Sequence, residues 1–166
     1  LVVHHAGAVL HGQVIEHKKL EAQRRLFERM VSPAVIEQLD PNSLQLGGKR
    51  TDITVLFADV RGFTSFSETQ SPENLVSILN RYLGAMAESV LSQEGTIDKF
   101  MGDAIMAWFN APVTQKDHTL RAVKAALAIR EAVENVLYKE LPKEAHLAFG
   151  AGIHYGEAIL GLIGTD

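Results

Sequence analysis

The chain has 166 residues, of which 46% are hydrophobic, and this size predicts one compact domain with an appendage. Its formal net charge of -4 argues against a nucleic-acid-binding protein, because such a protein usually presents a basic face. It contains no cysteine, which excludes disulfides and thiolate chemistry, and no apolar run approaching the roughly 20 residues of a membrane span.

The first 44 residues are predicted to form an N-terminal element separate from a domain over residues 45–166. Residues 11–30 are rich in helix formers, with apolar positions at helical spacing, which predicts an amphipathic helix. This helix would either pair as a two-stranded coiled coil or lie on its own domain. Ser32 and Pro33 are suited to begin a short helix over residues 33–39. Beginning at Leu1 and ending at Asp166, the chain is expected to be a piece of a longer protein.

The rest of the chain predicts an alternation of strands and helices. The expected elements are a strand over residues 53–58, a helix from Ser71 to Gly95, a hairpin of strands 96–100 and 104–109, a helix capped by Asp117 and reaching about Leu137, and a strand over 146–155 that Gly156-Glu157 turns into 158–163. This order predicts an α+β fold, a ferredoxin-like βαββαβ sandwich. Its palm-like antiparallel sheet would carry the helices on one face and follow the N-terminal helix.

Two aspartates stand where apolar strands end in glycine-containing turns. In the predicted fold, the end of the first strand and the tip of the hairpin are neighbours, so Asp59 and Asp103 should lie close together. Two converging carboxylates suit a hard divalent cation, which takes oxygen ligands and brings phosphates with it. Taken singly, Asp59 is also a common helix cap and Asp103 an ordinary turn residue. The pair indicates a magnesium-dependent enzyme that acts on a nucleoside triphosphate.

Two further features lie close to these aspartates in the sequence. A short helix is predicted to begin near Phe63 and Thr64, so the backbone N–H groups of Gly62, Phe63 and Thr64 could bind a β- or γ-phosphate. Strand alternation places Lys99 on the same face as Ile97 and Met101. From physics alone, Lys99 is best interpreted as a surface residue whose stem covers apolar neighbours.

Three segments resemble the class III nucleotidyl cyclases, specifically the bacterial adenylate cyclases. The first two are Phe57-Ala-Asp-Val-Arg-Gly-Phe-Thr64 and Gly95-Thr-Ile-Asp-Lys-Phe-Met-Gly-Asp-Ala-Ile-Met-Ala107. Gly150-Ala-Gly-Ile-His-Tyr-Gly-Glu157 resembles a later segment of the same family. The resemblance covers roughly residues 45–166. Residues 24–50 are similar to an element that transmits signals into such domains, and residues 1–20 to the last helix of an upstream sensor.

The resemblance implies an enzyme that converts ATP into cyclic AMP and pyrophosphate with two Mg²⁺ or Mn²⁺ ions per active site. It implies metal binding by Asp59, Asp103 and the Val60 carbonyl, and substrate binding by Lys99, Gly62, Phe63, Thr64, Met101 and Gly102. The ions activate the ribose 3′-hydroxyl and steady the leaving pyrophosphate. A lysine only donates hydrogen bonds, so Lys99 suits the acceptor N1 of adenine and not the protonated N1 of guanine.

The resemblance also implies partners. The expected assembly is a cytoplasmic homodimer, joined through the catalytic domain, with the N-terminal helix as a second candidate contact. An upstream sensor is expected, and neither nucleic acid nor a membrane segment. In the family a second base-contacting residue and an Asn/Arg pair lie beyond the position where this chain ends, so the chain as given should be nearly inactive. The alternatives are a silent nucleotide-binding or dimerisation relay, a guanylate-type cyclase, and a diguanylate cyclase, whose Gly-Gly-Asp/Glu-Glu-Phe hairpin is not seen here.

Overall fold

The structure, a computed structural model, describes residue 21 and residues 49–160. Glu21 lies in a helix. The rest of the predicted N-terminal element, its boundary at residue 44 and the last residues of the chain lie outside the described part. None of the helices in residues 21 and 49–160 combines the length and apolarity that crossing a membrane requires.

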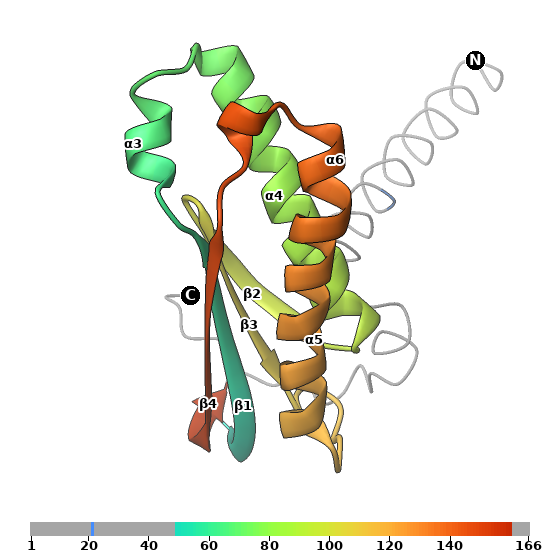
Figure 1. Cartoon of the computed structure of the whole chain (residues 1–166). Coiled ribbons are helices and arrows are strands. Elements are labelled where there is room, and N and C mark those ends of the chain that lie inside the picture. The colour runs from blue at the N-terminus through green and yellow to red at the C-terminus, as the bar shows by residue number, and fades with distance from the viewer. Residues whose placement is uncertain (1–20, 22–48, 161–166) are drawn as a thin grey trace, which may run out of the picture.

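The described chain forms one four-stranded antiparallel sheet with helices against one face (Figure 1). Its elements are β1 (Lys49–Val60), α3 (Phe63–Ser67), α4 (Pro72–Ser92), β2 (Thr96–Met101), β3 (Ala104–Phe109), α5 (His118–Ala132), a π-helical turn η2 (Val133–Leu137), α6 (Tyr138–Glu140), a 3-10 turn η3 (Lys143–Ala145) and β4 (Phe149–Leu160). The strand order is β2-β3-β1-β4, and α4 and α5 pack side by side. The predicted α+β, ferredoxin-like fold is confirmed.

The core lies between the sheet and the two long helices. Alternate residues of β1 and β3 are buried under the helices: Leu56, Ala58, Val60, Ile105, Ala107 and Phe109. The residues that meet them recur at helical spacing on α4 and α5: Ile78, Tyr82, Met86, Val90, Ala122, Ala125 and Ile129. The period of two on the strands and of three to four on the helices is what two packed layers require. The opposite face of the sheet carries no described helix and is called the open face below.

The predicted turn at Gly156-Glu157 is wrong, because β4 runs through it without interruption. Gly156 pairs with Ile53 and Glu157 with Asp52. The strand also begins at Phe149, three residues later than predicted. β1 is longer than predicted and continues back to Lys49, so it supplies ladder partners along the whole of β4. A glycine weakens a strand but does not end it when a neighbouring strand pairs with it.

The ends of the predicted helices also differ in detail. α4 ends at Ser92, and the residue with left-handed backbone is Glu94, with φ 57°. Gly95 is needed for space, because a Cβ there would lie 2.7 Å from Val90 and 2.8 Å from the Phe109 ring. At α5, Asp117 is the N-cap residue, as predicted, but its side chain makes no cap hydrogen bond. Its carboxylate instead accepts a 2.7 Å hydrogen bond from Arg121 Nε.

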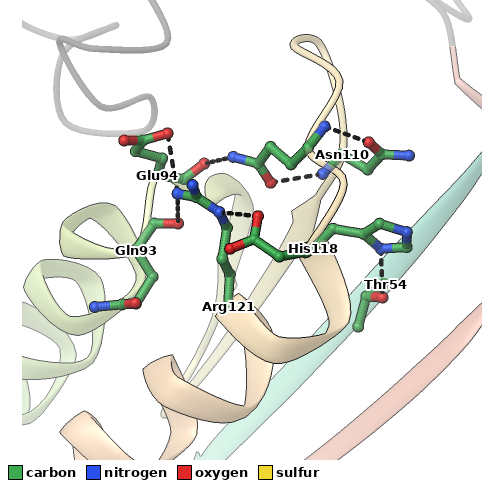
Figure 2. A network of polar contacts seen from close by, with 8 residues as sticks. Thr54, Gln93, Glu94, Asn110, His118 and Arg121 are labelled. Carbon is green, nitrogen blue, oxygen red and sulfur yellow. Dashed lines mark hydrogen bonds and ion pairs between the residues drawn. The ribbon is translucent and has the colours of Figure 1, made fainter.

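A polar network ties the β3–α5 connection to the end of α4 (Figure 2). The backbone N–H of Asn110 donates to Gln115 Oε1 at 3.0 Å, and the backbone N–H of Gln115 donates to Asn110 Oδ1 at 2.5 Å. Gln115 Nε2 donates to the Glu94 carbonyl at 2.9 Å, and Arg121 pairs with the Glu94 carboxylate at 3.0 Å. These contacts fix the β3–α5 loop, which lies at the end of the sheet opposite to α3.

Candidate functional site

The strand ends that carry the two aspartates are neighbours, as the fold predicts. Asp59, near the end of β1, pairs with Ala104, the residue that follows Asp103. The Val60 amide donates a 3.2 Å hydrogen bond to the Asp103 carbonyl. Both aspartates are partly exposed. Two carboxylate residues therefore stand at adjacent positions on one edge of the sheet, within reach of solvent.

Asp59 does not act as a helix cap. The N-cap of α3 is Gly62, whose φ of 77° is a left-handed conformation that glycine adopts most readily, and no side chain caps this helix. The Asp59 carboxylate instead faces Arg61, with Oδ1 3.4 Å from Arg61 Nε. Its side chain is 42% exposed and that of Arg61 66% exposed. Asp59 therefore pairs with a cationic side chain and does not cap α3.

Glycines of β4 make room beside this ion pair. Gly150 pairs with Asp59, and a Cβ at Gly150 would lie 2.7 Å from Asp59 Oδ1 and closer still to the Arg61 guanidinium. An open cleft of about 330 Å³ extends from this point. Its lining residues are Phe57, Ala58, Asp59, Arg61, Ala104, Gly150, Ala151 and Gly152. Neither Asp103 nor Lys99 lines it.

Lys99 lies on the open face, and the alternation predicted for it is wrong in one respect. Ile97 pairs with Ala107, but Lys99 pairs with Met106, so Asp98 is an extra residue in a β-bulge. Ile97 is buried under the helices, whereas Lys99 points to the other side of the sheet together with Met101. Uninterrupted alternation would have put Ile97 and Lys99 on the same face.

The bulge brings Lys99 to the same face as Asp59. Lys99 pairs with Met106, which pairs with Phe57, and Phe57 stands two residues before Asp59 on β1. The Lys99 ammonium lies 3.0 Å from Asp98 Oδ2, and its side chain is 58% exposed. Asp98, the extra residue of the bulge, therefore also forms an ion pair with Lys99.

The remaining predicted residues belong to the two turns at this edge. Gly102 forms the tip of the β2–β3 hairpin with a left-handed φ of 62°, and Met101 beside it is exposed. After β1, the first bond of α3 joins the Phe66 amide to the Gly62 carbonyl. The N–H groups of Gly62, Phe63 and Thr64 come before that bond, so no intrahelical acceptor serves them.

The donor set fits magnesium or manganese. In the described residues no group of three or more His, Cys, Asp or Glu side chains comes together, which argues against a closed all-protein metal cage there. Magnesium is commonly held by one or two carboxylates, with water and substrate phosphates completing its coordination. Asp59 and Asp103 supply two carboxylates, and the missing Cβ of Gly150 leaves room for the Arg61 guanidinium beside the first.

Sequence reasoning missed Arg61 and Asp98. Arg61 is two residues from Asp59, a spacing that keeps side chains on one face of an extended chain, and this signal was available. Asp98 gave no signal of its own, because a bulge depends on how the partner strand pairs.

Comparisons with known proteins agree on one family. The family model described as adenylate and guanylate cyclase catalytic domain matches residues 48–166. Adenylate cyclase 1 of Rhizobium meliloti (strain 1021) is 38% identical over 120 residues, which are 70% of this chain and 18% of that protein. The chain thus spans less than a fifth of that relative.

Two solved structures are similar in both fold and sequence. The guanylyl cyclase Cya2 is 45% identical with a TM-score of 0.62, over 73% of this chain and 62% of that one. The adenylyl cyclase CyaB from P. aeruginosa is 38% identical with a TM-score of 0.67, over 73% and 64%. Because the family match covers more than half of its residues, the chain belongs to the adenylate and guanylate cyclase catalytic domain family.

Proposed function

We propose that the chain is the output domain of an adenylate cyclase, which converts ATP into 3′,5′-cyclic AMP and pyrophosphate. One observation carries the proposal: Asp59 and Lys99 share the open face of the sheet, with Asp103 in the adjacent turn. The residues to which we assign the metal and the base are thus present in one chain. The name of the Rhizobium relative, adenylate cyclase, supports the same assignment.

Each residue has a role in this proposal. Asp59, Asp103 and the Val60 carbonyl would hold two Mg²⁺ or Mn²⁺ ions, and backbone N–H groups of Gly62, Phe63 and Thr64 would bind the terminal phosphates. When bound, the ions lower the pKa of the ribose 3′-hydroxyl and neutralise charge on the leaving group. The bond from O3′ to the α-phosphorus forms as the bond to pyrophosphate breaks, and the hydroxyl proton passes to water.

Substrate choice depends on Lys99 in this proposal. Its ammonium donates to N1 of adenine, while Met101 and Gly102 lie close by on the hairpin. One observation favours a guanylate cyclase instead, namely the 45% identity with Cya2, which exceeds the 38% identity with CyaB. A lysine cannot accept a hydrogen bond from the protonated N1 of guanine, and this favours ATP.

The open cleft supports a site completed by a second copy of the chain. Its volume of about 330 Å³ is at the lower end of the range for small-molecule sites, and Lys99 does not line it. In the proposed homodimer, the aspartates of one subunit and Lys99 of the other form one active site. An upstream sensor would act on this dimer through residues 1–44.

The metal-binding role is tested in the full-length protein by Asp59→Asn and Asp103→Asn. Each substitution keeps the shape of the side chain and removes its charge, so cyclic AMP formation should fall by about a hundredfold or more. Asp52→Asn is the matched control, because Asp52 is exposed at the other end of β1, and it should keep wild-type activity. Unchanged activity in the Asp59 and Asp103 variants would refute the assignment.

The substrate is tested by Lys99→Glu, with cyclic AMP and cyclic GMP both measured. The variant should lose activity with ATP and gain relative activity with GTP, because a carboxylate accepts from guanine N1. Lys116→Glu, an exposed lysine in the β3–α5 loop, is the control. Cyclic GMP as the wild-type product would establish the guanylate alternative. Nucleotide binding without any cyclic product would indicate a silent relay.

A further inference from the structure

Arg61 holds its guanidinium against the residue to which we assign a metal. Its Nε lies 3.4 Å from Asp59 Oδ1, and its own amide donates a 2.8 Å hydrogen bond to the Ala148 carbonyl. The backbone of Arg61 is thus anchored, while its side chain is 66% exposed. The guanidinium occupies the space left by the missing Cβ of Gly150.

We propose that Arg61 is a counter-ion that alternates between two anions. Without metal it pairs with Asp59, and with metal and nucleotide bound it turns to the triphosphate of the substrate. The inference rests on the proposed function, because it requires a divalent cation at Asp59 and phosphates on the following turn.

The first half of the inference follows from charge. A guanidinium and a divalent cation compete for the same carboxylate oxygen and repel each other at short range. The pair joins two solvent-exposed side chains, 42% and 66% exposed, so it is weak enough for a metal ion to displace. Until then it offsets the like charges of Asp59 and Asp103, which stand at adjacent positions.

The second half follows from position. Arg61 immediately precedes Gly62, the first of the three residues whose N–H groups are assigned to phosphate. A guanidinium released from Asp59 remains attached at this turn, beside the open cleft that it helps to line. Its planar set of N–H donors matches phosphate oxygens in pairs, which an ammonium cannot do.

The test is Mn²⁺ binding to the 166-residue chain, measured by calorimetry first without nucleotide. Arg61→Met should bind Mn²⁺ about two- to fivefold more tightly than the wild type, the change expected from losing an exposed ion pair. Arg61→Lys should remain near the wild type, because it keeps the charge. Arg50→Met, which removes an exposed arginine paired with Glu157 at the other end of β1, should change nothing.

The second measurement is binding of a non-hydrolysable ATP analogue in saturating Mn²⁺. Arg61→Met should bind the triphosphate analogue about tenfold more weakly, because charge-assisted hydrogen bonds are lost, and should bind AMP like the wild type. Equal Mn²⁺ affinity in Arg61→Met and wild type, or equal affinity for the triphosphate analogue, would overturn the inference alone. A wild-type chain that binds no Mn²⁺ would remove the proposed function and this inference together.

Discussion

At the scale of single residues, Tyr82 shows how one buried hydroxyl joins two parts of the fold. Its side chain is fully buried on α4, and its hydroxyl donates to the Ala145 carbonyl at 2.9 Å. The same oxygen accepts a 2.8 Å hydrogen bond from the Leu147 amide. Tyr82 therefore fixes the segment that leads into β4, and β4 presents Gly150 to Asp59.

We predict that Tyr82→Phe lowers the free energy of unfolding by about 1–3 kcal/mol, because two hydrogen bonds to the backbone are lost. The Leu147 amide and the Ala145 carbonyl keep only the 3.1 Å bond that joins them. Urea unfolding measures the change.

Burial raises the pKa of Tyr82 above its usual value near 10, although the hydrogen bond from the Leu147 amide opposes this. The contribution of the neutral Tyr82 hydroxyl to the free energy of unfolding is therefore fully present below pH 10. It is lost as the pH rises through the pKa of Tyr82 in the folded state. The difference between variant and wild type should shrink above pH 10, and a constant difference would contradict this account.

At the scale of the elements, two glycines of the α4 region have opposite roles. Gly95 has no room for a Cβ, because Val90 and Phe109 are both fully buried against it. Gly84 lies inside α4 with no atom within 4 Å of a Cβ placed there. The first glycine is required by packing, whereas the second only adds freedom to the unfolded chain.

Gly95→Ala should therefore destabilise the domain by about 1–3 kcal/mol through overpacking. Gly84→Ala should stabilise it by about 0.5–1 kcal/mol, because alanine is the better helix former. The two substitutions add the same methyl group, so each controls for the other in parallel urea unfolding curves. Equal effects of the two changes would show that the contacts around Gly95 relax freely.

The elements also show how far the sequence could predict this molecule. Order and packing were accessible because β1 and β3 are rich in apolar residues and α4 carries apolar residues at helical spacing. The nearness of Asp59 and Asp103 followed from the fold alone. The face occupied by Lys99 did not, because Thr96–Met101 contains no glycine or proline to mark the bulge. The continuous β4 was missed for a similar reason, since its course depends on the length of β1.

At the scale of the whole molecule, the described sheet ends in an exposed strand. Among residues 49–160, β4 pairs with β1 and with no other strand. Ile153, Tyr155 and Ile159 are 37%, 54% and 60% exposed on it. A long edge strand with apolar side chains readily pairs with another chain.

We predict that the 166-residue chain associates in a concentration-dependent manner and that Ile159→Lys shifts the population toward smaller species. A charge on an edge strand opposes pairing with a second strand. Sedimentation velocity measures the distribution, and Val76→Lys is the control, since Val76 is 56% exposed on α4. If both variants behaved alike, association through β4 would be excluded.

Asp98 has no partner across the ladder, whereas Ile97 and Lys99 on either side of it are paired. Deletion of Asp98 would leave the neighbouring side chains on their present faces of the sheet. Deletion of a paired neighbour would instead move the side chains on one side of the deletion to the opposite face. Insertions and deletions within β2 of related sequences should therefore occur mainly at the position of Asp98. A shorter relative would keep the lysine on the open face and lose only the carboxylate that pairs with it.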